Sequence, residues 1–142
     1  MVDIGEKNIT DRTAKAFACL KMQPETLDKL LKSELKKGDG LAAARIAGIM
    51  GAKKTSELIP LCHNIPIEKV EIEFSDNGID ELYITSIAKT SYKTGIEMEA
   101  LTAVSVAALT VYDMCKAIDR KMTVKEIRLI EKTGGKSDFF ND

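Results

Sequence analysis

The stretch from Ala100 to Tyr112 limits the fold most strongly, because as a helix it is apolar around nearly its whole circumference. Ala103, Ala107 and Ala108 within it permit other elements to approach closely. A surface helix needs only one apolar stripe, so a helix that is apolar on all sides must be covered on more than one side. We expect a sheet of the same chain on one side and another subunit on the other. The alternative is an alanine-rich helix that only a loop of its own chain covers.

The remaining elements follow from the spacing of apolar residues along the chain. Alternating apolar and polar positions predict strands. Leucines at helical spacing after Pro24 predict a helix, since a first helical turn tolerates proline. Asp39 can cap the helix after it. The expected order is a strand over 12–22, a helix from Pro24 through Leu35, a helix over 41–59, strands over 70–74 and 81–90, a helix over 95–119 and a strand over 127–130.

This order of elements favours an α+β fold. We expect a ferredoxin-like antiparallel sheet with the helices packed on one face, assembled into an oligomer. The 142 residues fit a single domain over 1–142, with a flexible C-terminal tail from about residue 133.

The charge balance and the cysteines exclude several classes of protein. With 21 basic and 22 acidic residues the formal charge is −1, so the basic excess of a nucleic-acid binder is missing. Cys19, Cys62 and Cys115 are odd in number and lack CxxC spacing, which is typical of reduced thiols. The N-terminus has no signal-peptide layout, and the longest apolar stretch is shorter than the roughly 20 residues that cross a bilayer. We therefore expect a cytoplasmic protein with neither a nucleic-acid nor a membrane partner.

Three carboxylates, Glu97, Glu99 and Asp113, lie at the two ends of the long helix. Glu99 and Asp113 lie on nearly the same helix face and about 21 Å apart at the helical rise per residue. One small substrate cannot easily contact both within a single chain. Either the two serve separate purposes, or a site combines residues from two subunits. The alternative is that each is a solvated charge at a helix end.

Lys116 follows Asp113 at a spacing of i, i+3, so the two side chains can meet on the helix surface. Such a pair can be a structural ion pair, or it can move protons in a reaction. Lys37 lies two residues before the capping Asp39, beside a helix N-terminus where exposed amides favour anions.

His63 is the only histidine, and it follows Cys62 in a stretch that Pro60 and Pro66 bracket. The prolines indicate a rigid loop or an edge strand, in which a histidine can bind a ligand. A lone histidine more often belongs to the surface or the core. Because the cysteines lack the spacing of zinc ligands, we expect no bound metal.

The run from Lys132 to Ser137 resembles the end of a Walker A motif, but Ile130 stands where its first glycine belongs and no helix follows. A basic, glycine-rich tail that closes over phosphates and a merely solvated tail are both compatible with this run. The basic candidates are Arg12, Lys37, Arg45, Lys53, Lys54, Lys132 and Lys136.

Short motifs along nearly the whole chain resemble those of one family, in the same order. They are Met1-Val2-Asp3, Lys37-Gly38-Asp39, and the runs 44–49, 58–63, 93–103, 109–117 and 134–137. Together they resemble the cyclic pyranopterin monophosphate synthases, the MoaC family. Asn64, Gly40 and Asp138 stand where that family commonly has proline, valine and glycine.

The resemblance implies a single catalytic domain, in a homohexamer built as a trimer of dimers with active sites between subunits. It implies a lyase of molybdenum-cofactor biosynthesis that acts after a radical-SAM GTP cyclase. The reaction converts 3′,8-cyclo-7,8-dihydro-GTP into cyclic pyranopterin monophosphate and releases pyrophosphate. Asp113 matches the active-site aspartate of the family. The resemblance places around the substrate Leu61, Cys62, His63, Met98, Glu99, Arg12, Lys37, Glu97, Lys116 and Lys132.

The implied reaction needs proton transfers but no electrons, so we expect no cofactor. We expect Lys37, Asp113 and Lys116 to be catalytic and to move protons. Glu97 and Glu99 can accept hydrogen bonds from the N–H groups of a guanine-derived ring.

Arg12, His63 and Lys132 can hold the triphosphate, with or without magnesium. One alternative function is a non-catalytic, oligomeric ligand-binding domain of the same fold. An RNA-binding module is a second alternative, but it would need a basic excess and exposed aromatic motifs.

Overall fold

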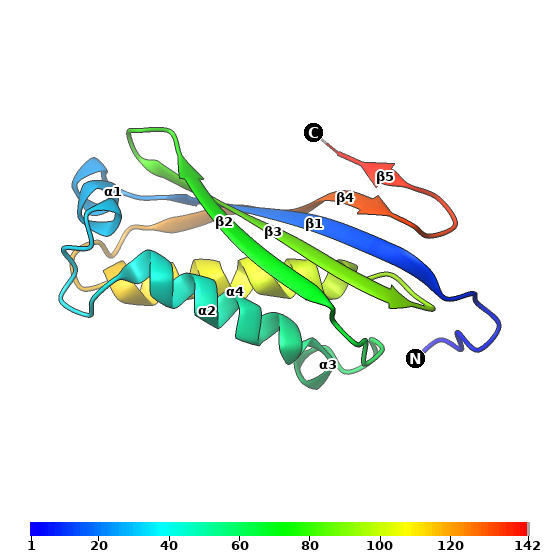
Figure 1. The fold of residues 1–142 in the computed structure, drawn as a ribbon. Helices are drawn as coiled ribbons and strands as arrows, with labels where there is room; N and C mark the ends of the chain where they lie inside the picture. The colour runs from blue at the N-terminus through cyan, green and yellow to red at the C-terminus, as the bar shows by residue number, and fades with distance from the viewer. Residues whose placement is uncertain (142) are drawn as a thin grey trace.

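The structure is a computed structural model, and it describes residues 1–141. Its order is strand, helices, two strands, helix and strand, with one short strand near the C-terminus (Figure 1). The elements are β1 (Thr10–Lys21), α1 (Pro24–Leu31), α2 (Gly40–Lys53), α3 (Thr55–Leu58), β2 (Lys69–Asp76), β3 (Glu81–Tyr92), α4 (Glu97–Cys115), β4 (Thr123–Thr133) and β5 (Phe139–Phe140).

The strands of the described residues form one antiparallel sheet with the order β2-β3-β1-β4-β5. The central strand, β1, pairs with β3 along its whole length and with β4 on its other side. On one face of β1, Ala14, Ala16, Ala18 and Leu20 are fully buried. The three small alanine side chains let a helix lie close against the middle of the sheet.

Helices α2 and α4 lie side by side on that face of the sheet (Figure 1). Helix α4 packs under β1, β3 and β4, and α2 packs beside α4 and reaches β2. Fully buried residues of α4 include Ala100, Ala103, Val104, Ala107 and Val111. The prediction of an α+β fold, with an antiparallel sheet and helices packed on one face, is therefore confirmed.

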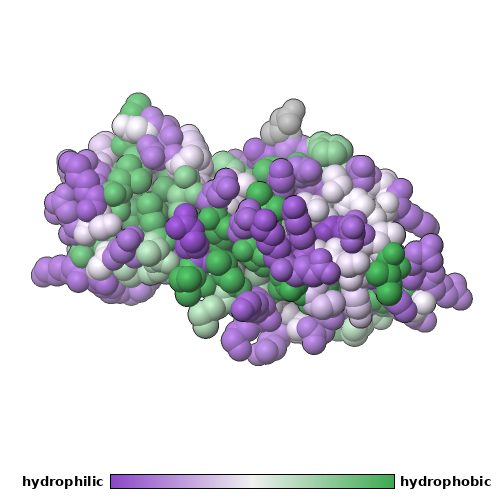
Figure 2. Space-filling view, viewed as in Figure 1, coloured by the Kyte–Doolittle hydropathy of each residue, from purple (hydrophilic) through white to green (hydrophobic). Residues whose placement is uncertain are grey.

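One stripe of α4 is left uncovered by its own chain. Leu109 is 63% exposed, and Leu101 and Tyr112 are partly exposed. Apolar side chains are also exposed over α2 (Figure 2). On this helix, Ile46 is 58% and Met50 is 54% exposed. The helix that the sequence predicts to be covered on two sides thus has the sheet and α2 against it, and an apolar stripe that faces outward.

Helix α1 is shorter than the predicted helix, which continued through Leu35. Ser33 has a φ of 56°, in the left-handed region that commonly ends a helix, and Glu34 N donates to Lys29 O. Leu35 nevertheless reaches the core from the following loop, since it is only 8% exposed.

The predicted helix over 41–59 is wrong in one respect, because it is two helices that separate at Lys54. The φ and ψ angles of Lys54 are −108° and 12°, outside the helical range. The Thr55 hydroxyl donates to Ala52 O over 2.8 Å, and such local side-chain bonds compete with helical ones.

Strand β5 was not predicted, and it lies in the tail that the sequence suggests is flexible. Phe139 and Phe140 pair with Lys132 and Glu131 of β4. The flexibility of the tail stays a prediction.

By length and composition alone, α4 could cross a membrane. However, 50% of its most apolar window is buried inside the fold. A core helix that packs against a sheet passes the same test.

Gly48 lies where α2 meets α4. A Cβ atom added there would lie 2.8 Å from the backbone oxygen of Ala103 and 3.2 Å from Ala107 Cβ. The backbone oxygen belongs to a buried helix and cannot move aside as a flexible side chain could.

We therefore expect Gly48→Ala to lower the free energy of unfolding by about 1–2 kcal/mol, because overpacking outweighs the better helix propensity of alanine. Urea unfolding at a fixed protein concentration measures the change. Ala42→Gln, at an exposed position of the same helix, is the control and should change it by less than about 0.5 kcal/mol. A Gly48→Ala chain as stable as the original would contradict the close α2–α4 contact.

Candidate functional site

The predicted site residues fall into two sets at opposite ends of α4. One set, which we call the acid–base group, contains Lys37, Asp113 and Lys116. The other set surrounds the start of α4 and includes Arg12 and Lys132 from the sheet. Asp113 lies sixteen positions after Glu97, which puts the two sets about 24 Å apart along the helix. Figure 1 shows the same separation, with the start of α4 near the N-terminus of the chain and its end near α1.

The structure brings the acid–base group together. Lys37 Nζ lies 2.9 Å from Asp113 Oδ2, and Lys116 Nζ lies 3.1 Å from Asp113 Oδ1. Lys37 Nζ also donates to the backbone oxygen of Asp113 over 3.2 Å. The hydrogen bond from Lys37, and next the one from Lys116, holds the pKa of Asp113 below its usual value. Asp113 is therefore an ionised carboxylate between two ammonium groups.

These side chains face the solvent within a single chain. The exposed fraction is 46% for Lys37, 54% for Asp113 and 57% for Lys116. An exposed ion pair contributes only about 0–1 kcal/mol to stability, so these contacts are weak stability determinants. The group is accessible to a substrate or to another subunit.

Lys37 reaches Asp113 because the loop between α1 and α2 turns sharply. Gly38 has a φ of 111°, which side chains other than glycine rarely adopt, and its N–H donates to Leu35 O over 3.0 Å. Asp39 then caps α2, as predicted, by accepting a hydrogen bond from Ala42 N over 3.0 Å.

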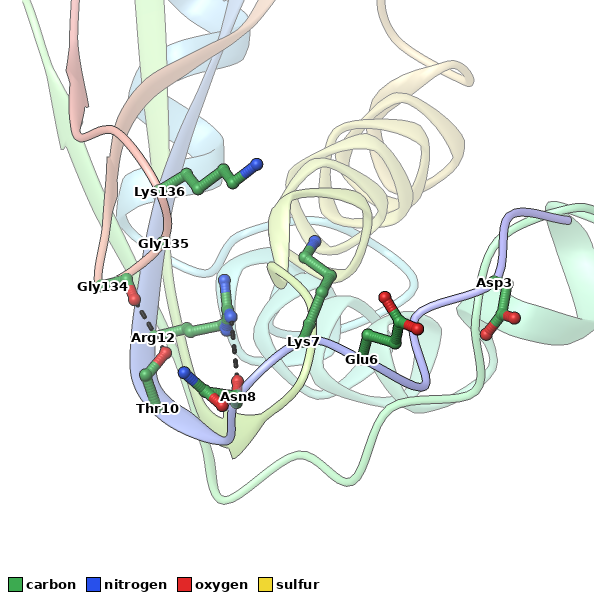
Figure 3. A pocket seen from close by; sticks show the side chains of 9 residues that line it. All are labelled: Asp3, Glu6, Lys7, Asn8, Thr10, Arg12, Gly134, Gly135 and Lys136. Carbon is green, nitrogen blue, oxygen red and sulfur yellow. Dashed lines mark hydrogen bonds between the residues drawn. The ribbon is translucent and has the colours of Figure 1, made fainter.

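A cleft of about 750 Å³ opens near the start of β1, beside the second set of residues. In Figure 3, Lys7, Arg12 and Lys136 extend into the same space from three separate segments of the chain. Converging cations of this kind suit an anionic ligand. The cleft is lined by Asp3, Glu6, Lys7, Asn8, Thr10, Arg12, Gly134, Gly135 and Lys136.

Arg12 is 7% exposed, and backbone carbonyls hold its guanidinium in place. Its Nε donates to Tyr92 O over 2.9 Å, and its Nη2 donates to Lys93 O over 3.3 Å and to Asn8 O over 3.4 Å. These carbonyls carry no net charge, so they do not compensate the positive charge of the guanidinium, which can attract an anionic ligand. A Cβ on Gly135 would lie 3.1 Å from Nη1, and the glycine therefore leaves room beside it.

The glycine-rich loop that carries Lys136 is fastened to the sheet. The Thr10 hydroxyl donates to Gly134 O over 2.8 Å, and Gly134 N donates to Asp138 Oδ1 over 3.2 Å (Figure 3 draws the first of these). Gly134 has a φ of 90°, which requires glycine. Lys136 is thus presented to the cleft by a defined turn.

Glu97 and Lys132 meet next to the cleft. Lys132 Nζ lies 3.4 Å from Glu97 Oε1, and both side chains are about one-third exposed, at 34% and 28%. A negative charge in the first turn of α4 is stabilised by the helix dipole. This pair joins the end of β4 to the start of α4.

Glu99 is a buried carboxyl group with an unusual proton affinity. It is 2% exposed, and within residues 1–141 its Oε1 has no hydrogen-bond partner. Burial raises the pKa of Glu99 to about 7, and the charge of Glu97 adds to this effect. Burial, and then the charge of Glu99, also raise the pKa of the Cys62 thiol, so the two groups are neighbours.

The remaining predicted residues of this set lie in the loop of Cys62 and in the first turn of α4. His63 Nε2 donates to Val2 O over 2.6 Å, which ties the N-terminal segment to the loop of Cys62. Leu61 is 70% exposed, and Met98 is partly exposed in the first turn of α4.

Other basic candidates have structural roles. Arg45 donates to Ile72 O over 3.1 Å and lies 5.3 Å from the ring centre of Phe74. Lys54 pairs with Glu57 over 3.8 Å. Lys7, in contrast, was not predicted although it lines the cleft. It lies in an N-terminal stretch without periodicity, so the sequence alone gave no signal for it.

Within residues 1–141, the structure contains no group of three or more histidine, cysteine, aspartate or glutamate residues that could hold a metal ion. The groups that are present can hold an anion and transfer protons. Asp113 stays ionised, whereas Glu99 can take up a proton near neutral pH, and carboxyl groups with separated pKa values are suited to different acid–base roles.

Comparison with known proteins gives one consistent result. A sequence profile of the MoaC family matches residues 1–135. A cyclic pyranopterin monophosphate synthase of Peptoclostridium acidaminophilum is 58% identical over 137 residues, which are 96% of this chain and 87% of the relative. The synthases of Listeria monocytogenes serotype 4a and Dinoroseobacter shibae are each 56% identical over 99% of this chain, and the matches cover 88% and 89% of those relatives.

The buried Glu99 makes stability depend on pH. The unfolded group has its ordinary pKa of 4.5 and the folded group has a pKa of about 7, so the folded protein binds more protons between these values. Stability should therefore fall as the pH rises from 4.5 to 7.

We expect Glu99→Gln to remove this dependence. Relative to the original chain, the free energy of unfolding of the variant should rise by up to about 3 kcal/mol between pH 5 and pH 8. Urea unfolding at both pH values measures the change. Glu57→Gln, whose side chain is 69% exposed, is the matched control and should show no such difference. An effect of Glu99→Gln that is equal at both pH values would contradict the burial of an unpaired carboxyl group.

Proposed function

Because the chain belongs to the MoaC family, we propose that it is a cyclic pyranopterin monophosphate synthase. In this role it converts 3′,8-cyclo-7,8-dihydro-GTP into cyclic pyranopterin monophosphate, and releases pyrophosphate, in molybdenum-cofactor biosynthesis. The observation that carries the proposal is 52–58% identity to relatives of that name over nearly the full chain. The substrate would be supplied in the cytoplasm by a radical-SAM GTP cyclase.

The cleft is suited to the triphosphate of this substrate. Lys7, Arg12 and Lys136 converge there, and Lys132 lies at its border with Glu97. Charge-assisted hydrogen bonds from such groups are strong, and they would also stabilise the charge of the departing pyrophosphate.

The carboxyl groups at the start of α4 are suited to the guanine-derived ring. A neutral Glu99 can donate a hydrogen bond as well as accept one, and a substrate group would give its unpaired Oε1 a partner. Met98 directly precedes Glu99 in the chain, Cys62 is its neighbour in space, and His63 follows Cys62. The exposed Leu61 can cover the ring.

The acid–base group is suited to the proton transfers of the rearrangement. Asp113 contacts both ammonium groups at hydrogen-bond distance, so a proton can pass between Lys37, Asp113 and Lys116.

The two sets of residues belong in one site only if subunits combine, because α4 holds them about 24 Å apart. We therefore propose that this ferredoxin-like chain forms a homo-oligomer, a hexamer built as a trimer of dimers. The uncovered apolar stripe of α4, with Leu109 63% exposed, supports such an assembly.

A direct assay separates the synthase from the alternative, a non-catalytic ligand-binding domain of the same fold. The purified chain is incubated with 3′,8-cyclo-7,8-dihydro-GTP, and pyrophosphate and the cyclic phosphate product are measured. We expect both products in equal amounts. Binding of the nucleotide without product would favour the ligand-binding domain.

We expect Lys37→Ala and Lys116→Ala each to lower kcat by at least about 100-fold, because each removes a proton-transfer group. Sedimentation and circular dichroism should show the assembly and fold unchanged, since the ion pairs are exposed. Lys54→Ala is the matched control, because Lys54 also pairs with a carboxylate at i, i+3 but lies outside the site. Near-normal kcat in either Lys37→Ala or Lys116→Ala would defeat the role assigned to that lysine.

A further inference from the structure

We propose that Asp119 is a positioning residue, whose buried carboxylate ties the start of α1 to the end of α4 and thereby holds Lys37 against Asp113. The proposal rests on the function proposed above for Lys37 and Asp113. The hydrogen bonds of Asp119 go to Gln23, Thr26 and Lys121. Asp119 therefore acts on Lys37 and Asp113 through the chain segments that it joins.

Asp119 is 3% exposed and accepts three hydrogen bonds. Its Oδ2 accepts from Gln23 N and from the Thr26 hydroxyl, both over 2.9 Å, and its Oδ1 accepts from Lys121 N over 3.1 Å. Burial alone would raise the pKa of Asp119, but these hydrogen bonds outweigh burial and hold the pKa below its usual value. The group is therefore charged at neutral pH and fully engaged with its neighbours.

These bonds anchor the N-terminal end of α1 to the segment that follows α4. Gln23 occupies the cap position, and its own side chain makes no capping hydrogen bond. The carboxylate of Asp119, 96 residues further along the chain, instead accepts from the backbone N–H of Gln23 and from the side chain of Thr26. Helix α1 has only eight residues, too few to form a stable helix alone, so it depends on such anchors.

The loop that carries Lys37 continues directly from α1 and is packed between the same elements. Leu30 of α1 is fully buried, and Leu35 of the loop is 8% exposed. A Cβ on Gly40 would lie 2.6 Å from Leu30 Cδ1, 3.1 Å from Leu35 Cδ1 and 3.7 Å from Met114 Cβ. The end of α1, the loop and the end of α4 thus meet at one point, directly beside Asp113.

The hydrogen bonds of Asp119 are stronger than the ion pair of Lys37 and Asp113, so they order the loop that carries Lys37. The pair of Lys37 and Asp113 is about half exposed, and exposed ion pairs contribute little. Hydrogen bonds to a buried charge contribute more. Asp119 also lies six residues after Asp113 on the same segment, with Lys116 between them. A change at Asp119 should therefore displace Lys37 relative to both groups.

The test compares Thr26→Val, Asp119→Asn and the original chain as full-length assembled protein. Thr26→Val keeps the size of the side chain but removes one donor, and Asp119→Asn keeps the shape but removes the charge. We expect amide hydrogen exchange of residues 32–39 to become about threefold faster or more, with β1 and β3 unchanged. We expect kcat to fall about tenfold with KM changed less than about twofold, since misplaced groups slow the chemical step.

Two variants serve as controls. Thr26→Ser keeps the hydroxyl donor, so amide exchange and kcat should stay at the values of the original chain. Asp76→Ala removes another turn-capping carboxylate, which accepts from Gly78 N over 2.8 Å at the exposed β2–β3 turn, and should alter neither.

Three outcomes would overturn the proposal: unchanged exchange over 32–39, faster exchange spread over the whole chain, or faster local exchange with unchanged kcat. A failure of the proposed function would look different, because the original chain would then release no pyrophosphate. In that case the exchange measurement would still decide whether Asp119 orders the loop of Lys37.

Discussion

The close packing of α4 against the sheet and α2 determines how far apart the two sets of candidate site residues lie. Small side chains on both partners, such as Ala16 in β1 and Gly48 in α2, allow this approach. A helix held in this way is a rigid rod, so the groups at its two ends stay about 24 Å apart. The same packing leaves one apolar stripe of the helix facing outward. The separation of the site and the surface for a partner are therefore two consequences of one buried helix.

The two ends of α4 shift the pKa values of their carboxyl groups in opposite directions. At the start of the helix, burial without a partner raises the pKa of Glu99 to about 7. At its end, hydrogen bonds from Lys37 and Lys116 lower the pKa of Asp113. A site that joined both ends would contain a proton donor and an ionised proton acceptor near neutral pH. This combination suits a rearrangement that moves protons but no electrons.

The sequence predicted the main helices and strands and the pair of Asp113 and Lys116 because local rules govern them. Lys37 lies 76 residues from Asp113, and only the family resemblance placed it in the acid–base group. Alternation along β1 and the i, i+3 spacing of Asp113 and Lys116 translate directly into structure. Two kinds of feature could not be predicted. The contact between Asp119 and the start of α1, and the place of Lys7 in the cleft, depend on residues far apart in the chain. The break at Lys54 depends on a local competition for hydrogen bonds that apolar spacing does not reveal.

If neighbouring subunits combine the two ends of α4 in one catalytic site, mixing two inactive variants should restore activity. Lys37→Ala removes a group at one end, and Lys132→Ala removes one at the other. When the two proteins are dissociated, mixed in equal amounts and reassembled, sites formed between different chains can contain both intact ends. We expect recovery of activity at roughly a quarter of the sites, the fraction expected for random assembly of a symmetric oligomer. No recovery on mixing, with both variants assembled and folded, would contradict it.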